Sequence, residues 1–133
     1  MSTATGAKYV FGKTVGLGFD EAVKRVTEEL AKEGFGVLTE IDVKSTLKKK
    51  LDIDVAPYRI LGACNPQFAH KAMELEPQIG ALLPCNVVVR VESGRTRVEI
   101  MDPQAVLKLV ERPEIAEIAG EVRKRLERVL AAV

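Results

Sequence analysis

The residue types best suited to chemistry gather in one stretch of the chain, from Gly62 to Val89. This stretch holds both cysteines, Cys64 and Cys85, and the only histidine, His70. A cysteine can serve as a nucleophile, a redox group or a ligand for a soft metal, and a histidine can act as an acid, a base or a metal ligand. This stretch is therefore the first candidate for a functional site.

The distance between the thiols depends on how the chain returns from one to the other. Cys64 ends a predicted strand at 58–64, and Cys85 precedes another at 86–92. If the helix between them alone returns the chain, the strands are parallel and the thiols lie at opposite ends of the sheet. If residues 77–84 run back as an extended segment of up to about 26 Å, the strands are antiparallel and the thiols come close. The second arrangement is favoured, because such a segment is longer than a strand.

Each thiol has a structural and a chemical interpretation. Free cysteine is among the most buried residue types, so the ordinary expectation is a small hydrophobic side chain inside the core. The chemical interpretation is a thiol of lowered pKa at Cys64, which precedes a predicted helix whose dipole would stabilise a thiolate. A reversible redox pair or soft-metal site formed by Cys64 and Cys85 follows as an alternative hypothesis.

Polar residues near the thiols complete a tentative ligand site. Asn65 followed by Pro66 is typical of a helix start, so the amide of Asn65 is expected to cap the helix. Asn86 stands in a predicted strand, where asparagine is uncommon and needs a partner when it is covered. A lone His70 lacks the clustered ligands of a zinc site and is expected to be structural. No catalytic residue, cofactor or metal is assigned, and the tentative ligand-binding residues are Cys64, Asn65, Cys85, Asn86, Arg59 and Arg90.

Composition narrows the classes of function. The 133 residues fit one domain, expected over residues 7–133 after a flexible tail at 1–6. Twenty basic against nineteen acidic residues give a formal charge of +1, which argues against general affinity for nucleic acid or an anionic membrane. No apolar run reaches the roughly 18 residues that span a bilayer, and a signal-peptide pattern is absent. The expected compartment is the cytoplasm, where thiols are normally reduced.

The remaining patterns predict an α+β domain. Strands are expected at 8–15, 35–42 and 58–64 and in a hairpin at 86–92 and 95–101, and helices at 19–33, 43–51 and 66–75, after Asp102 and from Pro113 onward. Strands with one apolar face and helices with one apolar stripe favour two layers, an open sheet with helices on one face. In strand 35–42, alternation places Phe35, Val37, Thr39 and Ile41 on one face.

The uncovered face of this sheet is expected to be polar. By the same alternation it would show Glu40, Asp42, Arg59, Asn86, Arg90, Arg97 and Glu99. Such a face either stays wet or meets a partner, and a twofold homodimer is the commonest partner. Its mixture of acids and bases, without aromatic platforms or apolar wedges, disfavours nucleic acid as that partner.

Three motifs carry a resemblance to a known family. The runs GFGVLTEIDV at 34–43, PYRILGACNP at 57–66 and IGALLPCNVVV at 79–89 resemble the family catalogued as domain of unknown function 302. The resemblance covers nearly the whole chain and implies a fold similar to that of the TATA-box-binding protein, a curved, mostly antiparallel sheet with helices on one side, as well as dimers. It supports the antiparallel return and implies no activity. Relatives tend to have a glycine where this chain has Asp52 after Leu51.

The leading hypothesis is a cytosolic small-molecule-binding or accessory homodimeric domain without an assigned reaction. Its ligand would lie near Asn65, Asn86 and the two cysteines. The competing class is an enzyme or carrier that works through the thiols, and the sequence leaves open whether any reaction is catalysed.

Overall fold

The computed structural model describes residues 7–133, so the predicted tail at 1–6 lies outside the described residues. The strands are Val10–Val15 (β1), Gly36–Asp42 (β2), Tyr58–Cys64 (β3), Cys85–Glu92 (β4) and Arg95–Met101 (β5). The α-helices are Phe19–Lys32 (α1), Val43–Leu51 (α2), Pro66–Leu75 (α3), Pro103–Leu107 (α4) and Pro113–Ala132 (α5). Two 3₁₀ helices, Pro77–Leu82 (η2) and Lys108–Val110 (η3), follow α3 and α4.

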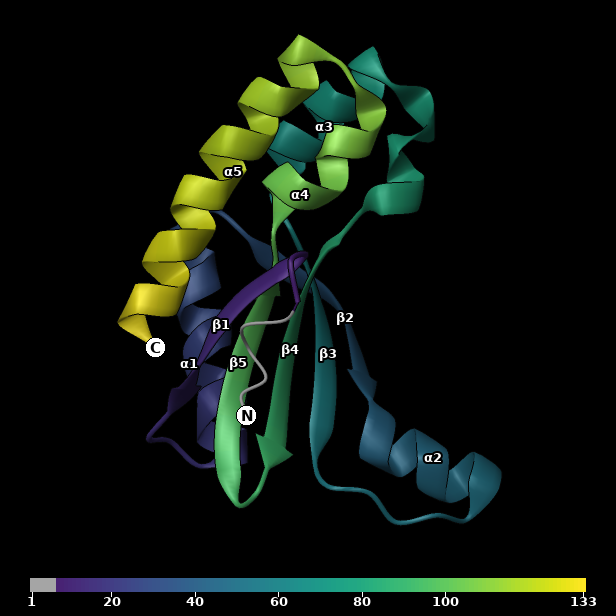
Figure 1. The fold of residues 1–133 in the computed structure, drawn as a ribbon, viewed down its shortest axis with the longest axis vertical. Coiled ribbons are helices and arrows are strands. Elements are labelled where there is room, and N and C mark those ends of the chain that lie inside the picture. The colour runs from purple at the N-terminus through teal and green to yellow at the C-terminus, as the bar shows by residue number, and fades with distance from the viewer. Residues whose placement is uncertain (1–6) are drawn as a thin grey trace.

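The strands form one open antiparallel sheet in the order β1-β5-β4-β3-β2. The predicted α+β class with a mostly antiparallel sheet and packed helices is confirmed. In Figure 1, α5 runs along the side of the sheet formed by β1 and β5, α3 and α4 lie beyond one end of the strands, and α2 projects from the other end. The similarity to the TATA-box-binding protein stays a prediction. Within residues 7–133, no helix is long and apolar enough to span a bilayer.

Alternate strand residues form the core together with the apolar stripes of two helices. The buried strand residues include Leu61 and Ala63 of β3, Cys85, Val87 and Val89 of β4, and Val98 and Ile100 of β5. The helices contribute Ala22, Val26 and Leu30 of α1 and Ile115, Ile118, Ala119, Val122, Leu126 and Val129 of α5. Each buried valine, leucine or isoleucine stabilises the fold by roughly 1.5–3 kcal/mol relative to an exposed one.

The predicted alternation of β2 is wrong beyond Val37. The pairing with β3 shifts register between Val37 and Thr39, so Leu38 is an extra residue in a β-bulge. Because one extra residue exchanges the two faces of a strand, Thr39 and Ile41 no longer share a face with Phe35. Leu38 and Ile41 are accordingly 66% and 48% exposed.

The prediction that Glu40, Asp42 and Arg59 lie on the uncovered face is also wrong. Arg59 pairs with the fully buried Val89 across the β3–β4 ladder, so its side chain shares the helix-facing side. Its guanidinium lies 5.3 Å from the ring centroid of Phe19, the first residue of α1. The guanidinium also donates hydrogen bonds to the carboxylates of Glu40 and Asp42. The bulge brings Glu40 and Asp42 to the same side. The other predicted residues, Asn86, Arg90, Arg97 and Glu99, do share the uncovered face, as the strand register shows.

The antiparallel return between the cysteines is confirmed, although the extended segment predicted at 77–84 is wrong. Residues Pro77–Leu82 form η2 instead. Helix α3 leaves the end of β3, and η2 brings the chain back to the same end of the sheet, where β4 begins (Figure 1). Two successive helical segments therefore reverse the chain.

Candidate functional site

Three of the predicted site residues line one small apolar cavity at the end of the sheet beneath α3. Cys64 and Asn65 reach it from the end of β3, and Cys85 from the start of β4. The cavity measures about 40 Å³, and the other walls are Phe35, Ala63 and apolar side chains of α3, α4, α5 and the segment before β4. Ala63 pairs with Cys85 across the ladder, so the next residue, Cys64, is a diagonal neighbour. The prediction that the return brings the thiols together is confirmed.

Burial keeps both thiols protonated. It raises the pKa of Cys85 to about 11, with a smaller contribution from the negative charge of a nearby Cys64 thiolate. Burial also raises the pKa of Cys64. The predicted lowering of the Cys64 pKa at the start of α3 is therefore wrong, because desolvation disfavours the thiolate. Both cysteines are free.

Asn65 acts as the predicted helix cap. Its Oδ1 accepts a hydrogen bond of 3.4 Å from the backbone N–H of Phe68, and the residue is 7% exposed. Its Nδ2 lies where a Cβ at Gly34 would come within 2.9 Å of it. Gly34 has a φ of +87° and follows α1, so the glycine permits both the turn and the close approach of Asn65.

The other predicted site residues lie elsewhere. Asn86 is exposed on the uncovered sheet face, and Arg90 lies on that face with its Nε 2.7 Å from Glu99 Oε1. Arg59 lies on the opposite face with its Nη1 2.8 Å from Glu40 Oε2. The six tentative ligand-binding residues therefore occupy three places, and their role in binding stays a prediction. Both arginines already pair with carboxylates, so their positive charge is less available to bind an anionic ligand.

The ion pair between Arg90 and Glu99 also changes the pKa of the glutamate. The hydrogen bond that Arg90 donates lowers the pKa of Glu99, against the opposite effect of partial burial. Arg97 reinforces this by lying 3.5 Å from the same carboxylate. The uncovered face therefore carries a fixed, charged network rather than a free basic patch.

His70 takes no part in the cavity. Its side chain is 76% exposed and lies 4.0 Å from Glu74 one turn further along α3. Among residues 7–133, no group of three or more histidine, cysteine, aspartate or glutamate side chains is placed to hold a metal ion. The soft-metal hypothesis gains no support from this arrangement.

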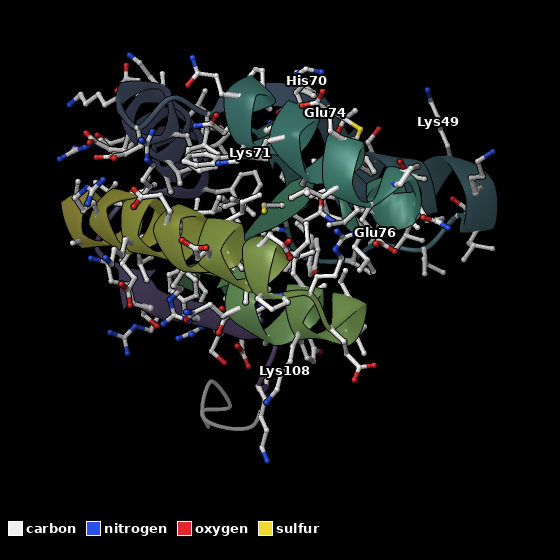
Figure 2. All side chains as sticks on the ribbon, turned by 90° about the horizontal axis from the view of Figure 1, so that it is seen from above. Lys49, His70, Lys71, Glu74, Glu76 and Lys108 are labelled. Atoms are coloured by element: carbon white, nitrogen blue, oxygen red, sulfur yellow. The ribbon has the colours of Figure 1, made fainter. Side chains whose placement is uncertain are left out.

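A larger groove beside the cavity was missed from the sequence. It measures about 530 Å³ and lies between α3 and α5, which pack side by side (Figure 2). Its lining residues are Phe68, Lys71, Glu74 and Leu75 of α3 and Glu114, Glu117, Ile118 and Glu121 of α5. The signal was present, because Glu114, Glu117 and Glu121 recur three and four residues apart and so share a helix face.

Comparison with known proteins identifies relatives over nearly the whole chain. The family described as "Domain of unknown function DUF302" matches residues 11–133. The crystal structure of an uncharacterized conserved DUF302 protein from Bacillus stearothermophilus is similar, with 33% sequence identity and a TM-score of 0.88. The alignment covers 95% of this chain and 98% of that one. No curated protein matches. These findings confirm the resemblance drawn from the motifs.

Proposed function

We propose that this chain is a non-catalytic binding domain of the cytoplasm that acts as a homodimer. The chain belongs to the DUF302 family, and membership of this family assigns no reaction. Its ligand is a small molecule whose neutral, apolar part enters the cavity at Cys64, Asn65 and Cys85. One observation carries the proposal: two antiparallel strands deliver both thiols to the same apolar cavity, where burial keeps them protonated.

The size and chemistry of the cavity support an apolar occupant. A cavity of about 40 Å³ exceeds the roughly 10–15 Å³ that one water needs. Apolar walls hold water poorly, because a buried water needs two or more polar partners. The amide of Asn65 already accepts the cap hydrogen bond, and a thiol is only a weak donor. A short alkyl group therefore suits this space better than a polar ligand.

Protonated thiols weigh against the competing enzyme or carrier. The nucleophile is the thiolate, and a pKa of about 11 leaves roughly one Cys85 thiol in 10⁴ ionised at pH 7. An ordinary cysteine has a few per cent in that form. A Cys85→Ser protein that kept its ligand and lost a turnover would nevertheless favour the enzyme.

Xenon binding tests the cavity directly, because xenon is a small apolar probe. We expect saturable xenon-dependent chemical-shift changes in amides around Cys85 and Ala72, both of which line the cavity. Cys85→Ala enlarges the space and should strengthen binding, whereas Ala72→Val fills it and should weaken binding. Absence of saturable binding in both the wild type and the Cys85→Ala protein would overturn the proposal. Native mass spectrometry of freshly purified protein would report any retained molecule.

The uncovered face of the sheet supports the homodimer. It presents half-buried aliphatic side chains, Ile60 and Val88, beside carboxylates and guanidinium groups such as Glu99 and Arg90. A twofold interface brings the same patch together from both copies, so a patch with charges of both signs can complement itself. Mixed charge of this kind suits a second copy better than nucleic acid, which needs a concentrated positive field.

Sedimentation equilibrium tests the dimer. We expect a dimer for the wild type and a monomer for Val88→Arg, which places a charge in the middle of the uncovered face. Ala105→Arg adds the same charge at an exposed position of α4 and should leave the dimer intact. A monomeric wild type, or a Val88→Arg protein that stays dimeric, contradicts an interface on this face.

A further inference from the structure

The groove between α3 and α5 combines an apolar floor with an acidic rim. Its floor consists of Phe68, Leu75 and Ile118, and its rim is lined mainly by glutamates. A volume of about 530 Å³ falls within the roughly 300–1,000 Å³ range of small-molecule sites. The groove is therefore large enough to hold an organic molecule along the two helices.

The charge of the rim selects for a cation. One ammonium, on Lys71, faces four carboxylates, which gives the lining a net charge of −3 at neutral pH. Two of the four glutamates lie near arginines outside the lining: Arg125 Nε is 3.3 Å from Glu121 Oε2, and Arg112 Nε is 3.9 Å from Glu114 Oε1. Glu117 is exposed, and among residues 7–133 no cationic side chain lies within 4.0 Å of it. A ligand cation at Glu117 would relieve the repulsion between these carboxylates.

Phe68 of the floor already contacts a cation that is not part of the groove lining. The guanidinium of Arg125 lies 5.0 Å from the ring centroid of Phe68, within the range of a cation–π interaction. The guanidinium also donates to the backbone oxygen of Glu33, at the end of α1 and outside the groove. Phe68 therefore offers the groove apolar surface, which suits the chain of a ligand rather than its ammonium group.

The groove adjoins the apolar cavity. Phe68 and Ile118 line both, so these two side chains form the partition between them. Ile118 is 6% exposed, whereas Phe68 is only half-buried. An alkyl chain that lies on the floor of the groove would therefore point at the cavity that holds Cys64 and Cys85.

We propose that the groove binds a cationic amphiphile, an alkylammonium compound whose head lies among Glu74, Glu117 and Glu121. Its chain lies over Leu75 toward Phe68 and Ile118. This inference rests on the proposed function, because it supplies the head group for a ligand whose apolar part enters the cavity. A basic peptide would meet the same rim, but the short floor and the small adjoining cavity fit a small ligand better.

Titration with octylammonium chloride below its micelle concentration, followed by amide chemical shifts, tests the proposal. We expect saturable binding centred on α3 and α5, at least tenfold tighter than that of octyl sulfate, which has the same chain and the opposite charge. Affinity should rise from butyl- to octylammonium, by up to about fourfold for each methylene that becomes buried. Equal affinity for both octyl compounds, or no dependence on chain length, would overturn the proposal. Binding of a basic peptide without binding of octylammonium would also overturn it.

Paired variants separate the rim from general electrostatics. Glu74→Gln with Glu117→Gln changes two exposed side chains and should weaken octylammonium binding by about three- to tenfold. Glu28→Gln with Glu127→Gln makes the same change of net charge at exposed positions outside the groove and should leave binding unchanged. Equal weakening by both pairs would refute the rim. If xenon binds and octylammonium does not, only the proposal of a cation-binding groove is refuted. If octylammonium binds and xenon does not, the proposed function of the cavity is refuted, whereas the proposal for the groove is supported.

Discussion

The thiol of Cys85 should couple folding to alkaline pH. Burial raises its pKa to about 11, whereas in the unfolded chain the thiol titrates near its ordinary value of 9.0. Between these values the unfolded chain has released a proton that the folded chain still holds. The free energy of unfolding therefore falls as the pH rises from about 9 to about 11 and levels off above. Each factor of ten in proton affinity is worth about 1.4 kcal/mol, so the expected loss is about 3 kcal/mol.

Urea unfolding from pH 8 to pH 11 under reducing conditions measures this loss. The quantity to compare is the difference in unfolding free energy between the wild type and Cys85→Ala, because contributions that both proteins share cancel in it. That difference should change by about 2 kcal/mol at the expense of the wild type, because at pH 11 the folded thiol is itself about half ionised. Cys64→Ala is the matched control and should retain most of the pH dependence, since Cys64 is the less buried thiol. A difference that stays constant with pH would refute the shielding of Cys85, and so would its rapid reaction with Ellman's reagent at pH 8 in the folded protein.

Three further predictions concern single positions outside the thiol pair. Asp52 has a left-handed backbone (φ 53°), so Asp52→Gly should raise the urea midpoint and stabilise the fold by up to about 1 kcal/mol, and a lower midpoint would contradict this. A Cβ at Gly62 would clash with Thr39 Oγ1, so Gly62→Ala should lower the free energy of unfolding in urea by about 1–3 kcal/mol. Thr39→Ala in the Gly62→Ala background should restore most of the lost stability, and absence of this rescue would exclude the clash. Glu99 has a lowered pKa, so its ion pair stabilises the fold above the ordinary glutamate pKa and is lost as the pH falls through the lower folded value. Glu99→Gln should therefore flatten the loss of stability between about pH 5 and pH 3, and an unchanged slope in urea unfolding would argue against the pair.

Local signals in the sequence were enough to place the helix starts and the hairpin. Asn65 before Pro66 and Asp102 before Pro103 each cap a helix through a side-chain oxygen, as predicted. Ser93 and Gly94 both have positive φ angles, 52° and 75°, which is the conformation that a two-residue hairpin turn requires. These features depend on a few neighbouring residues, so the sequence specifies them without knowledge of the rest of the fold.

Features that depend on distant partners could not be predicted. The bulge at Leu38 follows from how β2 meets β3, and no residue within β2 marks it. The bulge moved Glu40 and Asp42 to the helix-facing side, where both carboxylates accept hydrogen bonds from Arg59. Arg59 lies on that side for a separate reason, its pairing with the buried Val89. Prolines at both ends of 77–84 argued against an α-helix, yet a proline is acceptable in the first turn of a 3₁₀ helix, which is what forms there.

The candidate site shows why residue types alone misjudged the chemistry. A helix N-terminus stabilises a nearby negative charge by about 0.3–1 kcal/mol, yet burial raises the pKa of Cys64, the thiol that precedes α3, and raises the pKa of Cys85 to about 11. The sequence displays the helix start directly, but burial exists only after α3, α4 and α5 close over the ends of β3 and β4. Because the larger effect is the tertiary one, the same two cysteines that suggested a nucleophile become walls of an apolar cavity. The chemistry of the neighbouring groove then depends on charge at its rim and on the partition formed by Phe68 and Ile118, neither of which contains a reactive group.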